Sequence, residues 1–519
     1  MRVGVFGWGI VAPKSPNVDA FRRNLASSDS WLAPFNGFGP DNFLVGTPEF
    51  RFSDYRPWIE ARFPPRRFQQ LGEKMDLPAL YAVGAFIQAL EQNPGIENEL
   101  QNLGTAAHVY VGTGIGSLGL TYEASIKLYH SQRRWDRFWA QPERNSQLRE
   151  YLATPKEQRS AEAPAEPDSV PAENRDAAEV AWWRYWAARS PDLASYLAEL
   201  AEIDGLCIEG EIEKGKLRLL REKDRLNSKL QKKWGAPEPP WMVSPNLIWN
   251  IHNVPAAQIS MLGKITGLAF APVAACSTFG VALKLAMNVI RLREAKAVVV
   301  GATDPPPHPL SVGAFYSARV LSADRTVSVP LTRLQGTHVS GGSVVWLVGD
   351  FDYMRAKGFK PLGMEPLAVG VSSDAHHIIT PTTEGPRAAI LQALAEAGVT
   401  PDAIATWDLH ATATPGDYSE VASFRSVFSD SVLVTARKGT FGHGMGAGGG
   451  WELTAQYLGY EQGQLFPTPL ARDAVNPSIQ KVHERYVFDS ACEAPPGLGG
   501  KLSMGIGGIN ACVISRPLT

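Results

Sequence analysis

Four side chains in the second half of the chain have the chemistry of a thiol-dependent enzyme. Cys276 lies in "VAACSTFGVALKLA", His410 in "DLHATATPGD", and Lys438 and His443 in "TARKGTFGHGMGAGGGWE". Each stands in a turn of small residues after an apolar stretch, where glycine lets backbone segments approach closely. Taken alone, a buried cysteine is more often a structural thiol and a histidine a structural hydrogen-bonding group. A cysteine grouped with two histidines and a lysine instead favours a nucleophilic thiol assisted by acid–base groups.

The position of Cys276 predicts an activated thiolate. Residues 280–296, which follow it closely, have the pattern of a helix, so that Cys276 is expected at a helix N-terminus. Free backbone N–H groups and the positive end of the helix dipole favour thiolate over thiol at such a position. We therefore expect the thiol pKa to be lowered.

The composition excludes several other classes of function. The 519 residues include 50 Lys and Arg against 52 Asp and Glu, a balance that gives no reason to expect a nucleic-acid partner. The four cysteines are scattered without a CxxC pair, which fits a reducing compartment better than disulfides or a metal site. No apolar run is long enough for a membrane span, and the N-terminus lacks the pattern of a signal peptide. We expect a cytoplasmic protein.

The elements that must position these side chains alternate between strand and helix patterns. Strands are expected at 2–6 and 297–304, helices at 280–296 and 386–399, and a closing hairpin at 501–515. Such alternation predicts an α/β fold in which helices cover the sheets.

Two similar halves and one insertion account for the length. An apolar strand that leads into a polar turn occurs near the N-terminus and again at 366–377. From 122 to 242 the chain becomes charged and rich in tryptophan, with the composition of a flexible segment at 160–179 and amphipathic helical stretches after it. We interpret this block as a mostly helical insertion. The predicted domains are 1–121 with 243–365, the insertion 122–242, and 366–519.

Two glycine patterns match a dinucleotide-binding fingerprint. "GWGIVA" at 7–12 and "GIGSLG" at 114–119 each follow a strand pattern. Pro13 opposes a helix directly after the first, and the second lacks an acidic residue at the distance that a βαβ unit requires. A nicotinamide or flavin site is therefore disfavoured.

Six segments, in the same order, resemble the β-ketoacyl-acyl carrier protein synthases, the elongating type II ketosynthases of the thiolase-like condensing-enzyme superfamily. "VAACSTFGVALKLA" is similar to the active-site cysteine block, "HATATP" to HGTxTP, and "KGTFGH" to KSxxGH. "VYVGTGIGSLGL" resembles the GxGIGG turn, "SSDAHHIITPTTEG" the SSDAxHxTxPxxxG stretch, and "MGIGGINA" the FGFGGxNA hairpin. The resemblance covers most of 1–120 and 243–519 and includes both glycine patterns.

The resemblance implies a thiolase-like fold, with two pseudo-symmetric halves in a layered α-β-α-β-α arrangement. It also implies decarboxylative Claisen condensation in fatty acid or polyketide-type biosynthesis, in which Cys276 takes an acyl chain and malonyl-acyl carrier protein extends it. Substrates would be carried on the phosphopantetheine of an acyl carrier protein, with no intrinsic cofactor and no metal. A homodimer is expected, with a heterodimer containing a related ketosynthase-like subunit as the alternative.

Individual roles also follow from the resemblance. His410 and His443 would assist malonyl decarboxylation, and Lys438 would orient His443. The backbone N–H groups of Cys276 and Ile506 would form the oxyanion hole, while the family's two hairpin phenylalanines are Met504 and Ile506 here, which changes the gate beside the cysteine. The remaining roles are supporting for Glu452 and Asp374, and substrate-binding for Thr412, Thr414, Ile115, Ile506 and Met504.

Several interpretations stay open at this point. Arg62, Arg66 and Arg67 offer a basic surface for the carrier protein, or are ordinary solvated arginines. The insertion would reshape the acyl pocket or add a partner surface. A catalytically silent chain-length-type subunit and an acyltransferase that uses the same cysteine are the alternative functions. The presence of the cysteine, both histidines and the lysine together disfavours both alternatives.

Overall fold

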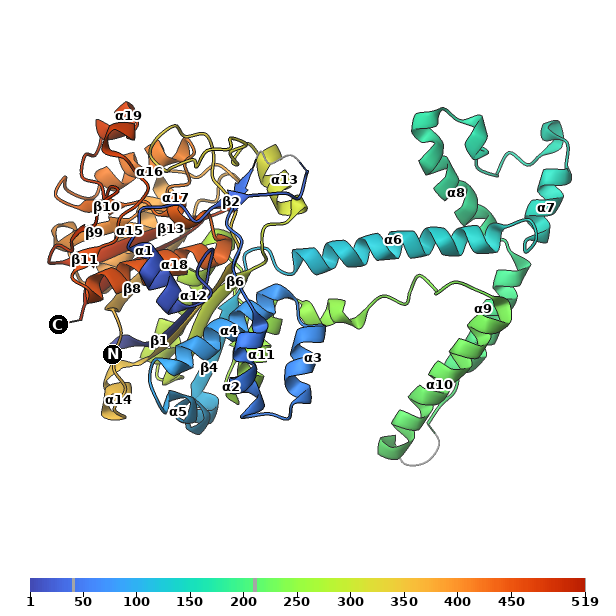
Figure 1. Ribbon diagram of the computed structural model, residues 1–519, viewed down its shortest axis with the longest axis horizontal. Coiled ribbons are helices and arrows are strands. Elements are labelled where there is room, and N and C mark those ends of the chain that lie inside the picture. The colour runs from blue at the N-terminus through green and yellow to red at the C-terminus, as the bar shows by residue number, and fades with distance from the viewer. Residues whose placement is uncertain (40–42, 209–211, 519) are drawn as a thin grey trace. The chain divides into compact units, whose positions relative to one another are not determined.

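The computed structural model describes residues 1–39, 43–208 and 212–518, and contacts within the chain divide it into two units (Figure 1). The first unit comprises Met1–Gly119 with Ile248–Thr519, and the second comprises Leu120–Leu247. Within the described ranges, none of the helices has the length and hydropathy that crossing a bilayer requires.

The first unit contains two five-stranded sheets that repeat one topology. Their strand orders are β1-β7-β6-β4-β5 and β10-β9-β13-β14-β8. In each sheet one edge strand and its two neighbours pair antiparallel, and the remaining strands pair parallel. The repeat confirms the predicted pair of similar halves. The strands are β1 Val3–Val11, β4 Ala107–Gly112, β5 Ala269–Phe270, β6 Ala297–Asp304, β7 Gly342–Asp350, β8 Met364–Ser373, β9 Ile404–Asp408, β10 Leu433–Thr435, β13 Leu498–Gly505 and β14 Ile509–Pro517.

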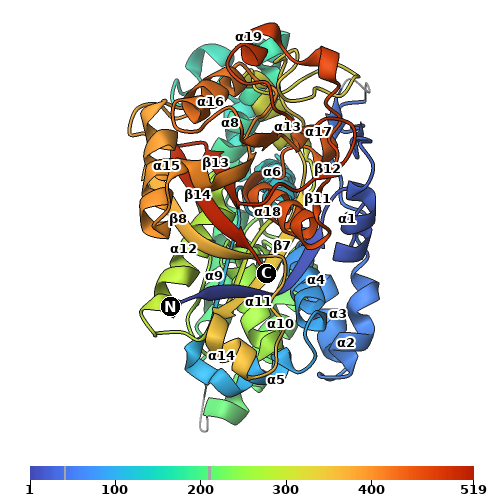
Figure 2. The same cartoon turned by 90° about the vertical axis from the view of Figure 1, so that its left-hand side faces the viewer.

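Helices form three layers around these two sheets. The middle layer is α12 (Thr278–Arg291) and α18 (Met445–Glu461), each of which contacts strands of both sheets. α4 (Leu77–Glu91) and α11 (Val254–Gly263) cover the outer face of the first sheet. α15 (Glu384–Ala397) covers the outer face of the second, and lies beyond β8 and β14 in Figure 2. The predicted α-β-α-β-α layering is confirmed.

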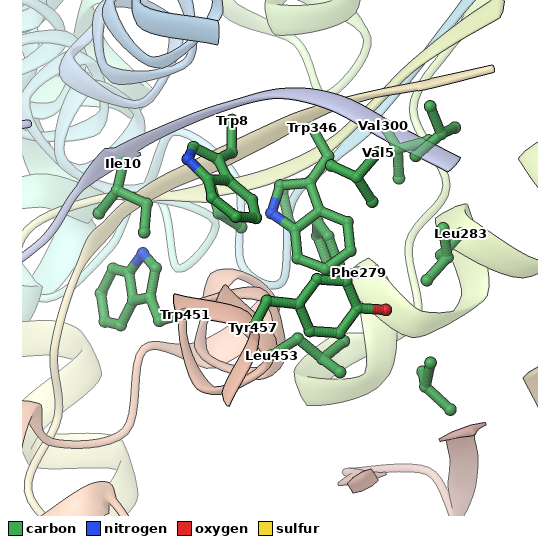
Figure 3. Packing of buried hydrophobic residues seen from close by; sticks show 14 of the residues in the cluster. Val5, Trp8, Ile10, Phe279, Leu283, Val300, Trp346, Trp451, Leu453 and Tyr457 are labelled. Carbon is green, nitrogen blue, oxygen red and sulfur yellow. The ribbon is translucent and has the colours of Figure 1, made fainter. Parts of the chain in front are cut away.

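Large aromatic side chains fill the space between the first sheet and the middle helices (Figure 3). Trp346 packs on Phe279 and Tyr457, with ring centroids 5.1 and 4.9 Å apart. Its indole N–H donates to Thr454 Oγ1 at 2.9 Å, and Trp451 donates to the carbonyl of Ser343 at 3.0 Å. The indoles of Trp346 and Trp451 therefore bury a large apolar area without leaving their N–H donors unpaired.

Shorter elements surround the layers. Asn17 caps the first helix, and its Oδ1 accepts from the N–H of Ala20 at 2.9 Å. The other helices of this unit are α1 Val18–Leu25, α2 Arg56–Glu60, α3 Arg66–Lys74, α5 Ile96–Leu103, α13 Pro309–Ser317, α14 Phe351–Ala356, α16 Gly416–Arg425, α17 Lys438–Phe441 and α19 Pro477–Gln480, and the short strands are β2 Ala33–Pro34, β3 Leu44–Val45, β11 Gln464–Leu465 and β12 Cys492–Glu493.

The second unit is helical and has an aromatic core of its own. Trp135, Trp139, Trp182, Trp186 and Tyr196 are buried together, so that the tryptophans noted in the sequence pack on one another. The stretch 160–179 contains only short 3-10 turns before the helix that begins at Arg175. The helices that reach into or form this unit are α6 Leu118–Ala140, α7 Ser146–Ala153, α8 Arg175–Ala187, α9 Pro191–Asp204 and α10 Ile212–Trp234.

Candidate active site

A cavity of about 1010 Å³ in the first unit brings the predicted cysteine and both predicted histidines together. Cys276, His410 and His443 reach it from three different segments, and all three are buried. Lys438 and Glu452 lie buried behind this lining. The other predicted residues that line the cavity are Ile115, Asp374, Thr412, Thr414, Met504 and Ile506.

The fold fixes Cys276 in a tight turn between β5 and α12. The turn is a 3-10 segment, Ala275–Ser277, and Ala275 has a left-handed φ of 48°. Ser277 Oγ donates to the carbonyl of Ser503 at 3.1 Å and to that of Ile509 at 2.7 Å. These bonds tie the cysteine turn to the closing hairpin of β13 and β14.

The closing hairpin approaches Cys276 closely because Gly505 has no side chain. A Cβ at this position would lie 2.8 Å from the carbonyl oxygen of Ala274 and 3.3 Å from the backbone nitrogen of Cys276. The approach brings the backbone N–H of Ile506 close enough to the cysteine sulfur that it lowers the thiol pKa, and the N–H of Cys276 itself acts in the same direction. Two N–H donors therefore converge where an acyl oxygen on this sulfur would carry negative charge.

Burial keeps Cys276 protonated, and the expected lowering of its pKa is wrong. α12 begins at Thr278, directly after the 3-10 segment that contains the cysteine. Burial raises the thiol pKa to about 11, although the charge of Lys438 and the N–H of Ile506 act in the opposite direction. The resting group is a neutral thiol, so acyl transfer requires a base to remove its proton.

The rate of Cys276 alkylation should therefore keep rising well above neutral pH. With iodoacetamide we expect a rise of about tenfold per pH unit between about pH 7 and pH 10, because the thiolate fraction grows in that proportion below the pKa. Peptide mass spectrometry gives the rate at each site, and exposed Cys207 provides an internal comparison. A plateau of the Cys276 rate near pH 8 would show that the thiolate is stabilised after all.

Lys438 positions His410. Its Nζ lies 3.5 Å from His410 Nδ1, also donates to the carbonyl of His410, and pairs with Glu452 Oε1 at 2.8 Å. The expectation that Lys438 orients His443 is wrong, since its contact is with the other ring. An ammonium has only donors, so His410 Nδ1 must accept and Nε2 must carry the ring proton.

Both histidines are neutral at physiological pH. Burial is the largest cause of this, and the positive charge of Lys438 is the second. Together they hold the pKa of His410 well below its usual value and lower the pKa of His443 to about 3. The two rings lie edge to face, with centroids 5.3 Å apart. A pair of neutral imidazoles can accept the thiol proton and can donate N–H to a developing oxyanion.

Asp304 is a buried carboxylate that the sequence analysis missed. It ends β6 and accepts from the N–H groups of Gly114 and Ile115 through Oδ1, at 2.8 and 2.9 Å. Its Oδ2 accepts from the N–H of Gly446, at the start of α18, at 2.8 Å. Asp304 therefore joins the turn that presents Ile115 to the helix that follows His443. An acidic residue at the end of the apolar stretch "AVVVGATD" was the available signal.

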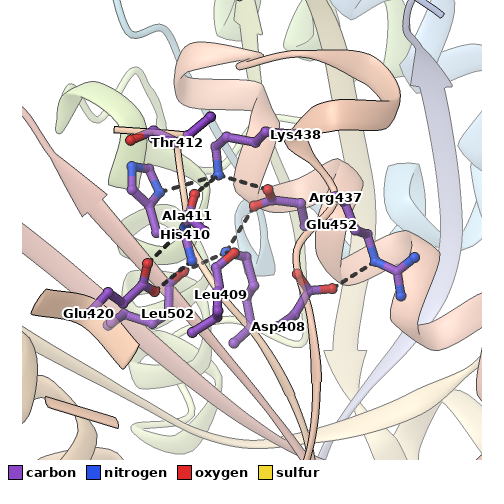
Figure 4. A network of polar contacts seen from close by, with 12 residues as sticks. Asp408, Leu409, His410, Ala411, Thr412, Glu420, Arg437, Lys438, Glu452 and Leu502 are labelled. Atoms are coloured by element: carbon purple, nitrogen blue, oxygen red, sulfur yellow. Dashed lines mark hydrogen bonds and ion pairs between the residues drawn. The ribbon is translucent and has the colours of Figure 1, made fainter. Parts of the chain in front are cut away.

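Two carboxylates of α16, Asp417 and Glu420, fix the turn that contains His410. Figure 4 shows Glu420 beside His410 and Ala411. Glu420 accepts from the N–H groups of His410 and Ala411 at 2.7 and 2.8 Å, and Asp417 accepts from that of Thr412 at 2.8 Å. Their spacing of three residues on one helix face was a signal that the sequence analysis did not use.

Asp374 supports the closing hairpin from the cavity wall. Its carboxylate accepts from Asn510 Nδ2 at 2.7 Å and from the N–H of Thr382 at 2.8 Å. The predicted carrier-docking arginines do not line the cavity. Arg62 pairs with Glu97 at 2.8 Å and Arg67 donates to Gln258 at 2.9 Å, so both have partners within the chain.

Comparisons with known proteins agree with these motifs. The family descriptions "Beta-ketoacyl synthase, N-terminal domain" and "Beta-ketoacyl synthase, C-terminal domain" match residues 221–349 and 365–471. The 3-oxoacyl-[acyl-carrier-protein] synthase 2 of Rhizobium meliloti (strain 1021) is 30% identical over 292 residues, which cover 54% of this chain and 68% of that protein. The chloroplastic 3-oxoacyl-[acyl-carrier-protein] synthase I of Arabidopsis thaliana is 30% identical over 281 residues, which cover 50% of this chain and 58% of that protein.

The fold is also that of solved ketosynthase structures. A solved β-ketoacyl synthase from Burkholderia phymatum STM815 superposes with a TM-score of 0.68, covers 100% of both chains, and is 17% identical. The two family matches contain the cysteine and both histidines of the cavity, together with the lysine and glutamate behind them. The bacterial relative shares sequence over more than two thirds of its length, and the residues of the cavity lie within the two matched family regions. The chain therefore belongs to the β-ketoacyl synthase family.

Proposed function

We propose that this protein is an acyltransferase of the condensing type, which extends a cysteine-bound acyl chain with a malonyl unit on an acyl carrier protein. The observation that carries the proposal is the convergence in one cavity of a thiol, two neutral imidazoles and two backbone N–H donors. Acyl transfer alone needs the thiol and the donors, whereas decarboxylation also needs donors for an enolate, which the second imidazole supplies.

The first half-reaction loads the chain on Cys276. Sγ attacks the acyl thioester, the bond from the acyl carbon to Sγ forms, and its bond to the pantetheine sulfur breaks. The thiol proton passes to a neutral imidazole and then to the departing pantetheine thiolate. The N–H groups of Cys276 and Ile506 stabilise the tetrahedral oxyanion.

The second half-reaction forms the carbon–carbon bond. The malonyl group loses carbon dioxide, and the electrons of the broken bond form an enolate whose oxygen accepts hydrogen bonds from His410 and His443. A bond forms between the enolate carbon and the carbonyl carbon of the acyl-cysteine, and the bond from this carbonyl carbon to Sγ breaks. The released thiolate then takes a proton from solvent. The product is a β-ketoacyl thioester that is two carbons longer.

The cavity lining supports binding sites for both parts of the substrate. Leu118, Leu310 and Phe315 offer apolar surface for the acyl chain, beside Ile115. Thr412 and Thr414, whose hydroxyls are 3.0 Å apart, are suited to hydrogen-bond the pantetheine arm. We propose a cytoplasmic location, in keeping with the scattered cysteines, and a homodimer as the working form that the family resemblance implies.

Intact-protein mass spectrometry tests the function directly. Wild type and Cys276→Ala are incubated with a panel of acyl-carrier thioesters, and malonyl-acyl carrier protein is then added. We expect an acyl adduct that requires Cys276 and is discharged as a β-ketoacyl product two carbons longer. Acylation without discharge would identify an acyltransferase that does not condense. If none of the donors gives an adduct, the protein is a catalytically silent subunit.

A further inference from the structure

A second buried lysine, Lys501, completes the polar network behind the cavity. It lies in β13, its side chain is 1% exposed, and its Nζ is 2.8 Å from Glu452 Oε2. The same ammonium donates to the carbonyl of Leu502 and lies 3.4 Å from that of Leu409, the residue before His410. Lys501 therefore has three oxygen partners in a site closed to solvent.

Lys501 and Lys438 share one carboxylate. Each ammonium binds a different oxygen of Glu452, at 2.8 Å in both cases. The neighbouring Asp408 is paired with Arg437 at 2.7 Å, and Glu420 accepts backbone N–H groups. Lys438, Lys501 and Glu452 together therefore carry one net positive charge. Placing an unneeded ammonium in the interior would be costly, which points to a role beyond packing.

We propose that Lys501 is a positioning residue: a cation built into the chain that occupies one oxygen of Glu452 and so leaves Lys438 in contact with His410. The inference rests on the proposed function, because His410 is the group on which Lys501 acts through its neighbours. With one carboxylate between two ammonium groups, Lys438 keeps its place between Glu452 Oε1 and the His410 ring. Without Lys501, Glu452 is free to draw Lys438 away from that ring.

Removal of Lys501 also changes the charge that faces the two imidazoles. The charged or titratable groups around them are Lys438 of α17, Glu452 of α18, Glu420 and Asp417 of α16, Lys501 of β13, Cys276 of the 3-10 turn and Asp374 of the cavity wall. The positive charges of Lys438 and Lys501 both disfavour imidazolium. Loss of one therefore raises the imidazole pKa values, and the acid limb of the pH–rate profile moves to higher pH.

Chemical rescue provides the test. Lys501→Ala leaves a space lined by a carboxylate and two carbonyl oxygens, which methylammonium can fill, whereas Lys501→Met fills that space with an apolar chain. We expect both variants to lose about tenfold in kcat for condensation at neutral pH, where Lys438 leaves the His410 ring, with a larger loss as the pH falls into the acid limb. Methylammonium chloride should restore most of the loss in Lys501→Ala but not in Lys501→Met, and sodium chloride at equal ionic strength should restore neither.

Thermal unfolding of the same variants distinguishes a purely structural role of Lys501 from a positioning role. Methylammonium should raise the Tm of Lys501→Ala alone, whether or not condensation is being measured. A Tm rise without recovery of kcat, or an unchanged acid limb in folded Lys501→Met, would reduce Lys501 to a structural ion and overturn the proposal. A wild type that is acylated but never discharged by malonyl-acyl carrier protein would instead defeat the proposed function, and the positioning role with it.

Discussion

Replacing His443 by alanine is expected to slow carbon dioxide release from malonyl-acyl carrier protein by about 10²–10⁴-fold. The imidazole is neutral because burial lowers its pKa to about 3, so it acts as a hydrogen-bond donor rather than as a cation. An alanine leaves the enolate oxygen with one donor fewer in a site shielded from water. His410→Ala should lose a similar factor, since Lys438 fixes its ring with the proton on Nε2.

The measurement separates the two half-reactions. Release of labelled carbon dioxide reports decarboxylation, and intact-protein mass spectrometry reports the acyl-Cys276 adduct. We expect at least one of the two single variants to remain acylated at a rate near that of wild type, because either neutral ring can accept the thiol proton. His108→Ala is the matched control, a buried histidine of β4 whose Nδ1 lies 2.8 Å from Tyr110 Oη and which does not line the cavity.

Two results would contradict this division of roles. If His443→Ala and His410→Ala release carbon dioxide at the rate of His108→Ala, the rings do not stabilise the enolate. If each variant instead loses acylation and decarboxylation by equal factors, the histidines act in loading and the enolate is stabilised by the backbone donors alone.

The periodic elements could be predicted from the sequence because their patterns are local. The apolar stretch at 297–304 is β6, and the Ala- and Leu-rich stretch at 386–399 overlaps α15, which begins two residues earlier at Glu384 and ends at Ala397. The turn after β4 presents Ile115 and the equivalent turn after β9 presents His410, as a repeated topology requires. Likewise, Cys276 precedes α12 and His443 precedes α18, the two helices of the middle layer.

Burial and pairing between distant residues could not be predicted in this way. The pattern "ACSTFG" indicates a helix start, but not that the thiol is 7% exposed and that its burial outweighs the helix dipole. Nothing near Lys438 in the sequence shows that it contacts a ring 28 residues away. A lysine at position 501 within an apolar strand was a visible anomaly, and its partner lies on a helix of the middle layer.

Replacing Glu452 by glutamine is expected to lower the free energy of unfolding of the first unit by about 3–5 kcal/mol. The variant leaves the ammonium groups of Lys438 and Lys501 buried beside a neutral amide. Both ammonium groups lower the pKa of Glu452 despite its burial, so the carboxylate is ionised in the folded protein at neutral pH. Reaction of Cys512, a buried thiol of β14 that does not line the cavity, with a thiol reagent in increasing urea follows this unit without interference from the tryptophans of the second one.

Adding Lys501→Met to Glu452→Gln should return about 1–3 kcal/mol of the loss, because it removes one of the two unpaired charges. In the wild-type background the same substitution should be destabilising, and this change of sign is what a shared carboxylate predicts. Glu365→Gln is the matched control, since Glu365 also bridges two cations, Arg2 and Arg516, at 2.7 Å. Those arginine side chains are 46% and 49% exposed, so water can solvate them and we expect a loss of only about 1 kcal/mol. Equal losses at the two glutamates would mean that the buried cluster is hydrated, and that its charges are too well screened to act on the histidines.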